Sequence, residues 1–143
     1  MFIGEYRHSL DTKGRLAIPV KFRNALERGG IVTKGIDRCL VLYPLKEWNV
    51  LAERIAQLPT SQADTRAFSR MTLAAAMDVL CDAQGRISVP EYLRDYAALK
   101  KNIIVAGLYN RFELWDESVW QEYKARMEEQ SGDIAERLSA FGV

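Results

Sequence analysis

The sequence predicts an α+β fold built from two tandem βαββα-type units that share one hydrophobic core. First, a thirteen-residue segment recurs, because DTKGRLAIPVKFR at residues 11–23 and DAQGRISVPEYLR at residues 82–94 are identical at five positions. Second, apolar residues alternate as in short strands and then change to helical spacing, in the same order in each half. Third, a unit of about half of the 143 residues buries little apolar surface alone, so two units in one chain gain by sharing a core.

The recurrence extends along the chain. The identical pairs at an offset of 71 are Asp11/Asp82, Gly14/Gly85, Arg15/Arg86, Pro19/Pro90 and Arg23/Arg94. One extra residue in the second copy moves the offset to 72, and matches continue at Ile31/Ile103, Gly35/Gly107, Leu42/Leu114, Trp48/Trp120 and Arg54/Arg126. Agreement in this order indicates a tandem duplication. We divide the chain into unit 1, residues 1–70, and unit 2, residues 71–143.

Each unit contains a tight turn that leads into a short strand. In the pattern Asp-x-x-Gly-Arg, aspartate can accept hydrogen bonds from backbone amides ahead of it, and glycine supplies a positive φ. Leu16 and Ile18 then alternate with Arg15 and Ala17, as a half-buried strand requires, and unit 2 repeats this alternation. A proline ends the ladder and starts a short helical segment, VKFRNAL in unit 1 and EYLRDYAAL in unit 2.

A hairpin follows the short helix in each unit. Apolar runs at Ile31–Lys34 and Cys39–Tyr43, broken by a glycine and an aspartate, predict the hairpin of unit 1. The runs Ile103–Ala106 and Arg111–Trp115 predict its counterpart in unit 2.

Longer helices complete the units. In unit 1, a single helical face that ends before Pro59 carries Leu45, Trp48, Leu51, Ile55 and Leu58. Residues 64–77 predict a second helix with Phe68, Met71 and Ala75 on one face. The equivalent stripe of unit 2 is Val119, Tyr123 and Met127, and the tail from Ser131 is either one more helix or partly frayed.

Composition is that of an ordinary globular protein. Hydrophobic residues make up 48% and charged residues 27%, which excludes global disorder and low-complexity fibres. The longest nearly apolar stretches, such as Ile103–Tyr109, are far shorter than the roughly 20 residues of a membrane span. The amino terminus carries charges within its first seven residues and lacks the apolar core of a secretory signal. We therefore expect a soluble, cytoplasmic protein with no membrane partner.

An enzyme is disfavoured, because no convincing nucleophile, base or metal-ligand set is present. The single histidine, His8, has no counterpart in unit 2, where Val79 stands, and a surface or DNA-facing role suits it better than catalysis. Cys39 and Cys81 lie in apolar runs without metal-ligand spacing and are interpreted as buried small hydrophobes.

The duplicated aspartates are the remaining candidates for chemistry. Asp11 and Asp82 can in principle form an acid–base pair, but turn capping and pairing with Arg15 and Arg86 is the simpler interpretation. An Asp-based hydrolase would need a metal or a turnover that Asp11→Asn abolishes, and we expect neither. No phosphate-binding loop, dinucleotide fingerprint or zinc spacing occurs, so no cofactor, metal or small-molecule substrate is expected.

Charge is distributed unevenly between the units. Residues 1–70 hold twelve Lys/Arg against seven Asp/Glu, a balance of +5, whereas residues 71–143 carry −4. A basic half joined to an acidic half can bind nucleic acid through one face, or pair head to tail with another copy. Uneven surface charge that arose by chance is the alternative.

Cationic side chains gather around the first turn. Six groups that can be cationic fall within seventeen residues: Arg7, His8, Lys13, Arg15, Lys21 and Arg23. Lysine offers a point charge for phosphate, arginine can bond guanine O6 and N7 together, and a β-ribbon can enter the major groove. We therefore predict a DNA-binding turn. The alternative is an ordinary solvated hairpin with an Asp11–Arg15 surface salt bridge of little energetic value.

The second turn is less basic. Asp78, Gln84 and Tyr92 replace Arg7, Lys13 and Lys21, which leaves Arg86 and Arg94 as its cations. Gln84 can still bond a base edge. Our hypothesis is that unit 1 supplies most of the DNA affinity and unit 2 mainly completes the fold and the assembly.

The repeated pattern D-x-x-G-R-x-x-[IV]-P-x-x-[FL]-R resembles the AbrB-like swapped-hairpin DNA-binding fold. The opening MFIGEYRHSLDTKGRLAIPVKFR, with the second motif copy near residue 85, is similar to the MraZ family of bacterial transcriptional regulators over essentially the whole chain. The resemblance implies one pseudo-symmetric swapped-hairpin β-barrel flanked by helices. It also implies a ring-shaped homo-oligomer that presents several turns to double-stranded DNA.

The resemblance further implies a role and a set of contacts. Members of the family bind tandem short repeats in the promoter of the division and cell-wall gene cluster that contains their own gene, and usually repress it. The family's Asp-x-x-x-Arg contact motif falls on Asp11 to Arg15 and on Asp82 to Arg86. The predicted DNA-binding residues are Arg7, Asp11, Lys13, Gly14, Arg15, Lys21, Arg23, Asp82, Gln84, Gly85, Arg86 and Arg94.

One alternative from another class stays open. The duplicated units can form a ring or scaffold whose basic turns contact an acidic protein, without reading DNA sequence. Exposed aromatic edges such as Trp48, Trp115 and Trp120 can serve a contact between copies, although core packing is the simpler role for at least two of them. A DNA-reading regulator would instead be associated with the nucleoid.

Overall fold

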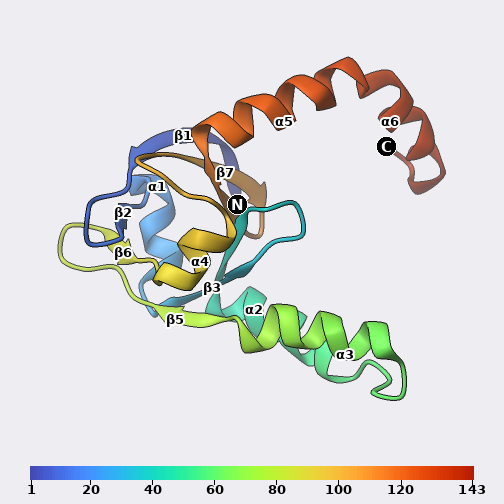
Figure 1. Cartoon of the computed structure of the whole chain (residues 1–143), viewed down its shortest axis with the longest axis horizontal. Coiled ribbons are helices and arrows are strands. Elements are labelled where there is room, and N and C mark those ends of the chain that lie inside the picture. Colours follow the sequence, from blue (N-terminus) through green and yellow to red (C-terminus); the bar gives the residue numbers. More distant parts are fainter.

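The computed structural model describes all 143 residues and contains one six-stranded antiparallel sheet, a two-stranded ribbon and flanking helices (Figure 1). The strand order of the sheet is β1-β7-β8-β4-β3-β5, and β2 pairs with β6 in the ribbon. The strands are β1 (Phe2–Ser9), β2 (Arg15–Ala17), β3 (Gly30–Lys34), β4 (Leu40–Pro44), β5 (Met77–Val79), β6 (Arg86–Ser88), β7 (Asn102–Tyr109) and β8 (Phe112–Asp116).

Helices follow the strands in each unit. They are α1 (Val20–Arg23), α2 (Leu45–Ala56), α3 (Ala63–Ser69), α4 (Glu91–Tyr96), α5 (Glu117–Glu129) and α6 (Ser131–Arg137), with short 3₁₀ turns at Asn24–Leu26 and Ser139–Phe141. The tail beyond Ser131 is therefore helical. Figure 1 shows α5 and α6 projecting from one side of the body and α2 and α3 from another, both away from the ribbon at the left. None of the helices has the length and apolar character needed to cross a membrane.

The strand order has the symmetry that a duplication predicts. Exchanging each strand for its counterpart (β1 for β5, β2 for β6, β3 for β7 and β4 for β8) reverses the order of the sheet onto itself. The first strand of each unit pairs with the hairpin of the other, since β1 pairs with β7 and β5 with β3. The two hairpins meet where β4 pairs with β8. The halves are thus interleaved.

The barrel implied by the family resemblance does not close. Strands β1 and β5 are the two edges of the sheet and do not pair with each other. They also differ in length, because β1 spans eight residues and β5 only three, so β5 offers few backbone groups for a closing ladder. The observed fold is a mixed α/β arrangement of tandem units around an open sheet.

The helix expected over residues 64–77 is shorter than predicted. Helix α3 ends at Ser69, a π-helical turn covers Arg70–Ala74, and Met77 begins β5. The reason is tertiary, because Met77 pairs with Val32 on β3, and this ladder overrides the helical spacing. Within this turn, the carbonyl of the buried Thr72 accepts a hydrogen bond from the buried Thr33 hydroxyl at 2.6 Å.

One hydrophobic cluster draws on both units. Its nineteen buried residues are Phe2, Leu10, Leu16, Ile18, Phe22, Leu26, Val32, Leu40, Leu42, Ala75, Val79, Ile87, Val89, Leu93, Ala97, Ile103, Val105, Phe112 and Leu114. Phe22 lies at its centre, with its ring centroid 5.0 Å from that of Phe2 and 5.4 Å from that of Phe112. The prediction of a shared core is confirmed.

A smaller cluster lies beneath α5. Buried Cys39, Ile104 and Trp115 pack there, and Trp120 approaches Trp115 with ring centroids 5.5 Å apart. Trp48 is half-buried, with its ring centroid 5.8 Å from that of Tyr43. Core packing is thus confirmed for Trp115, with Trp120 packed against it. Burial is confirmed for Cys39, whereas Cys81 is only half-buried at the edge of the main cluster.

Candidate nucleic-acid interface

The first turn is organised by the carboxylate of Asp11. Its Oδ1 atom accepts hydrogen bonds from the backbone N–H groups of Lys13, at 2.9 Å, and Arg15, at 2.8 Å. Its Oδ2 atom accepts from Nε of Arg15 at 2.7 Å. Gly14 has a φ of +79° and donates its N–H to the Asp11 carbonyl at 3.0 Å. The predicted roles of aspartate and glycine in the turn are both confirmed.

The second turn repeats the same geometry. Oδ1 of Asp82 accepts from the N–H groups of Gln84 and Arg86, both at 2.9 Å, and Oδ2 accepts from Nε of Arg86 at 2.9 Å. Gly85 has a φ of +75°. In both turns one carboxylate oxygen fixes the backbone while the other fixes the arginine side chain.

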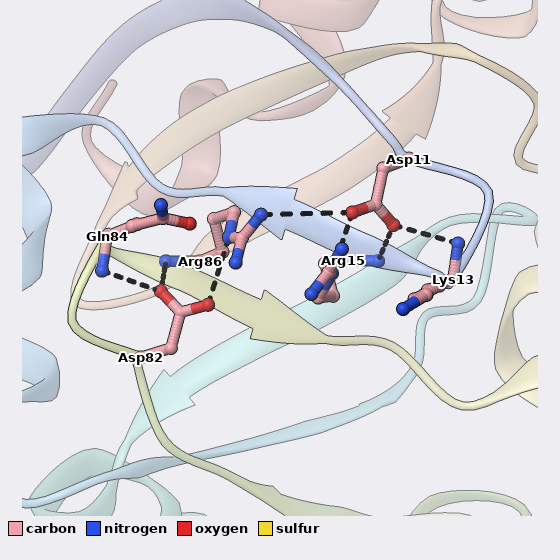
Figure 2. Close-up of polar contacts among 6 residues, drawn as sticks. All are labelled: Asp11, Lys13, Arg15, Asp82, Gln84 and Arg86. Atoms are coloured by element: carbon pink, nitrogen blue, oxygen red, sulfur yellow. Dashed lines mark hydrogen bonds and ion pairs between the residues drawn. The ribbon is translucent and has the colours of Figure 1, made fainter.

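The ribbon brings the two turns together. Arg15 pairs with Ser88 and Ala17 with Arg86, so Arg15 and Arg86 lie on the same face of adjacent strands (Figure 2). Nη1 of Arg86 also approaches Oδ2 of Asp11 to 3.9 Å. Leu16 and Ile87, which face the other way, are fully buried. Sequence reasoning predicted the outward arginines but not that the two turns adjoin.

The charges of this surface remain accessible to a partner. Lys13 and Gln84 are exposed at the turn tips, and the side chains of Arg15 and Arg86 are 35% and 29% exposed. Hydrogen bonds from the backbone N–H of Arg15 and Arg86 are the main cause that lowers the pKa of Asp11 and Asp82, so both are ionised near neutrality. The three cations exceed the two carboxylates, which leaves a small positive charge.

Arg23 and Arg94 lie behind the turns. Nε of Arg23 donates to the Ile18 carbonyl at 2.8 Å, and Nε of Arg94 donates to the Val89 carbonyl at 3.0 Å. Both side chains are half-buried. Both arginines therefore lie at the base of the two turns and not at the turn tips.

Arg7, Lys21 and His8 are engaged outside the two turns. Nε of Arg7 lies 2.6 Å from Oε2 of Glu117 at the start of α5, a contact between residues 110 positions apart that no local pattern predicts. The Lys21 ammonium lies 5.7 Å from the Tyr6 ring centroid. His8 is half-buried on β1, and burial, followed by the charge of Arg23, lowers its pKa.

Tyr92 has a structural role that the sequence did not predict. It stands where unit 1 has Lys21, a replacement that by itself indicates only the loss of a cation. In the structure its hydroxyl donates to the carbonyl of Ala75 at 2.7 Å, which fixes the connection between the π-helical turn and β5. No local pattern predicts this contact, because the two residues meet only in the folded chain.

The site is a protruding surface. None of the five principal cavities is lined by residues 11–15 or 82–86. No group of three or more His, Cys, Asp or Glu side chains is arranged to hold a metal ion. A convex, two-stranded ribbon with paired arginines has a shape that suits a groove better than a small molecule.

Comparison with known proteins gives consistent matches over the whole chain. The family described as "MraZ protein, putative antitoxin-like" matches twice, at residues 1–71 and 72–141. Similar curated proteins, each named transcriptional regulator MraZ, come from Natranaerobius thermophilus (47% identical), Pediococcus pentosaceus (46%) and Ligilactobacillus salivarius (46%). Each alignment spans 143 residues and covers all of both chains.

Proposed function

The chain belongs to the MraZ family, and from this premise we propose that it is a DNA-binding transcriptional regulator that reads DNA through its two Asp-x-x-x-Arg turns. The observation that carries the proposal is the paired arrangement of Arg15 and Arg86 on one exposed ribbon face, each held by its own aspartate. An ordinary solvated hairpin does not require two such turns to adjoin.

The proposed contact uses arginines that are already positioned. Each aspartate engages Nε of its arginine, and neither terminal amino group of Arg15 has a hydrogen-bond partner within the protein. These amino groups are the donors that bond guanine O6 and N7 in the major groove, where a two-stranded ribbon fits. Holding the side chain in advance reduces the rotamer entropy lost on binding.

Lys13 and Gln84 distinguish the two turns. Both are exposed and occupy equivalent positions, but only Lys13 brings a positive charge to the phosphate backbone. Arg7 and Lys21 add charge to unit 1, although Arg7 must first leave Glu117. The first turn therefore supplies most of the affinity in this proposal, and the second adds base-edge contacts.

Assembly of several copies strengthens the proposed interaction. One ribbon offers few phosphate contacts, and linking several in one homo-oligomeric ring on spaced DNA repeats raises avidity. Opposite net charges of the two units suit a head-to-tail contact, which closes into a ring when the rotation allows. Helices α3 and α6 project away from the ribbon, which leaves the turns free for DNA (Figure 1).

The proposed biological role is repression of the promoter of a division and cell-wall gene cluster that includes the protein's own gene. Binding to tandem short repeats there would block transcription and set the protein's own level. Such a regulator acts in the cytoplasm on the nucleoid.

The deciding experiment is a fluorescence-anisotropy titration of the full chain with a duplex from upstream of its own gene, at two salt concentrations. We expect selective, salt-sensitive binding that a scrambled duplex does not reproduce. Equal, weak binding to both duplexes would point to a scaffold whose basic turns serve an acidic protein, and would remove the regulator proposal.

Two matched variants separate the turns. Arg15→Ala and Arg86→Ala each remove one aspartate-held arginine from the same ribbon face. We expect the larger loss of affinity from Arg15→Ala, because its turn also carries Lys13. Equal losses would contradict the dominance of unit 1 while leaving sequence-specific binding intact.

A further inference from the structure

We propose that Arg23 and Arg94 are positioning residues that act across the repeat: each arginine holds the DNA-reading turn of the opposite unit. The inference rests on the proposed function for its effect on DNA, but its structural part is independent of DNA. It gives these two arginines a role behind the interface.

The contact of Arg23 with the second turn is the first observation. The guanidinium of Arg23, a unit 1 residue, fills the space in which a Cβ atom on Gly85 would lie. Its Nε donates to the Ile18 carbonyl, and the N–H of Ile18 donates to the Gly85 carbonyl at 2.9 Å. Gly85 is therefore held from unit 1 by a backbone hydrogen bond and by close contact with the Arg23 guanidinium.

Arg94 makes the reciprocal contact. Its Nε and Cζ atoms lie 3.0 Å from the position of a Cβ on Gly14, and Nε donates to the Val89 carbonyl. The N–H of Val89 in turn donates to the Gly14 carbonyl at 2.8 Å. The same three contacts thus occur twice, with the units exchanged.

Arginine is suited to this position by its shape. A planar guanidinium can lie flat against the glycine backbone while Nε, near the end of the stem, donates to a carbonyl. Lysine carries the same charge but has neither the plane nor an Nε–H group. The glycine is consequently required for two reasons, its positive φ and the space that the arginine occupies.

Because each arginine contacts the turn of the opposite unit, its loss should affect that turn even without DNA, which a direct DNA contact would not do. The first turn, which carries Lys13, depends on an arginine in the acidic unit 2. Loss of Arg94 therefore loosens residues 11–15, whereas loss of Arg23 loosens residues 82–86. If both arginines simply touched DNA, each variant would leave the free protein's turns unchanged.

Amide hydrogen exchange of the full chain without DNA tests whether each arginine holds the turn of the opposite unit. In Arg94→Gln we expect exchange at residues 11–15 to rise about tenfold with little change at residues 82–86, and Arg23→Gln should give the opposite pattern. Arg94→Lys should resemble Arg94→Gln, since charge alone does not provide the contact. Arg137→Gln, which removes an exposed cation on α6, is the control and should change neither turn.

DNA titration of the same variants supplies the second measurement. Arg94→Gln should weaken binding more than Arg23→Gln, because it disorders the more basic turn. Exchange that rises at each arginine's own turn, or at both turns equally, would overturn the crossed assignment, as would full rescue by Arg94→Lys. If the exchange pattern is crossed but no duplex binds selectively, the DNA-binding proposal has failed and the crossed contact stands.

Discussion

At the scale of the residue, the two carboxylate oxygens of Asp11 have different hydrogen-bond partners, and this explains why aspartate occupies the position. Oδ1 accepts from two backbone N–H groups and so builds the turn, while Oδ2 accepts from Arg15 and so aims the side chain. A substitution can therefore separate the shape of the turn from the orientation of the Arg15 side chain, because asparagine keeps one oxygen acceptor but replaces the other with a donor.

Asp11→Asn should weaken DNA binding while preserving the turn. Its amide oxygen can still accept from Lys13 and Arg15, but its NH₂ group cannot accept from the Arg15 guanidinium, which is left free to rotate. Asp11→Ala should lose both functions and bind more weakly still. Anisotropy titrations of the two variants, with amide exchange of residues 11–15 as the measure of the turn, provide the comparison. Identical exchange in both variants would contradict these separate roles of the two oxygens.

His8 should make the stability of the protein dependent on mildly acidic pH. Burial and the nearby Arg23 lower its pKa in the folded chain below the ordinary value of 6.5, so the unfolded chain binds the proton more readily. Stability is therefore complete above about pH 6.5 and falls as pH drops toward the lowered pKa. Chemical denaturation at a series of pH values should show this slope in the wild type. His8→Gln should flatten it, and an unchanged slope would place the effect elsewhere.

The carboxylates of the turns titrate in a separate and lower window. The folded-state pKa of Asp11 and Asp82 is depressed, so their contribution persists above the ordinary value of 3.8 and is lost only as pH falls through the lowered pKa. The His8 effect begins near the ordinary histidine pKa of 6.5 and the carboxylate effect only below 3.8, so the onset of each slope identifies its group.

At the scale of the element, the ribbon is a surface feature built over buried residues. Leu16 and Ile87 pair directly across it and have 0% and 1% of their surface exposed. The arginines on the outer face are consequently held over a packed layer, which gives a three-residue strand pair more order than its length would provide.

Leu16→Ala should destabilise the protein by about 2–5 kcal/mol, because it removes a fully buried side chain and leaves a cavity under both turns. Val20→Ala, at the 75% exposed start of α1, is the matched control and should change the free energy of unfolding by less than about 0.5 kcal/mol. Urea titrations of both variants measure the difference. A small effect of Leu16→Ala would mean that the ribbon is not anchored to the core.

Local patterns predicted elements well where the repeat and the periodicity agreed. The turns, the hairpins and α2 follow from residues that lie close together in the chain. The structure of residues 75–79 does not follow from local patterns. Ala75 fits a helical stripe, and Met77 begins a strand only because β3 is available to pair with it. Strand β5 is thus created by a partner more than forty residues away.

The candidate site shows the same limit. Asp11, Gly14 and Arg15 form a local motif, and their roles in the turn were predicted from the sequence. The contacts of Arg94 with Gly14, of Arg7 with Glu117 and of Tyr92 with Ala75 cross the chain, and no spacing rule encodes them. Duplication identified which residues are equivalent, but not that each unit supports the other's turn.

At the scale of the whole molecule, the two units form one folding unit. Four of the six strand pairings join unit 1 to unit 2, and only the hairpins β3–β4 and β7–β8 lie within a unit. The main hydrophobic cluster likewise takes residues from both halves. A sequence duplication has therefore not produced two independent domains.

Separate expression of residues 1–70 and 71–143 should accordingly give two chains without stable structure, while the full chain unfolds in a single transition. Each fragment lacks the partner strand of its own first strand and exposes both edges of its hairpin, so neither can complete a core. Mixing the fragments should restore structure, because all of the missing pairings become available between them. Circular dichroism of each fragment alone and of the equimolar mixture makes the measurement. A fragment that folds alone as a monomer would contradict the interleaved fold, and with it the dependence of each turn on the opposite unit.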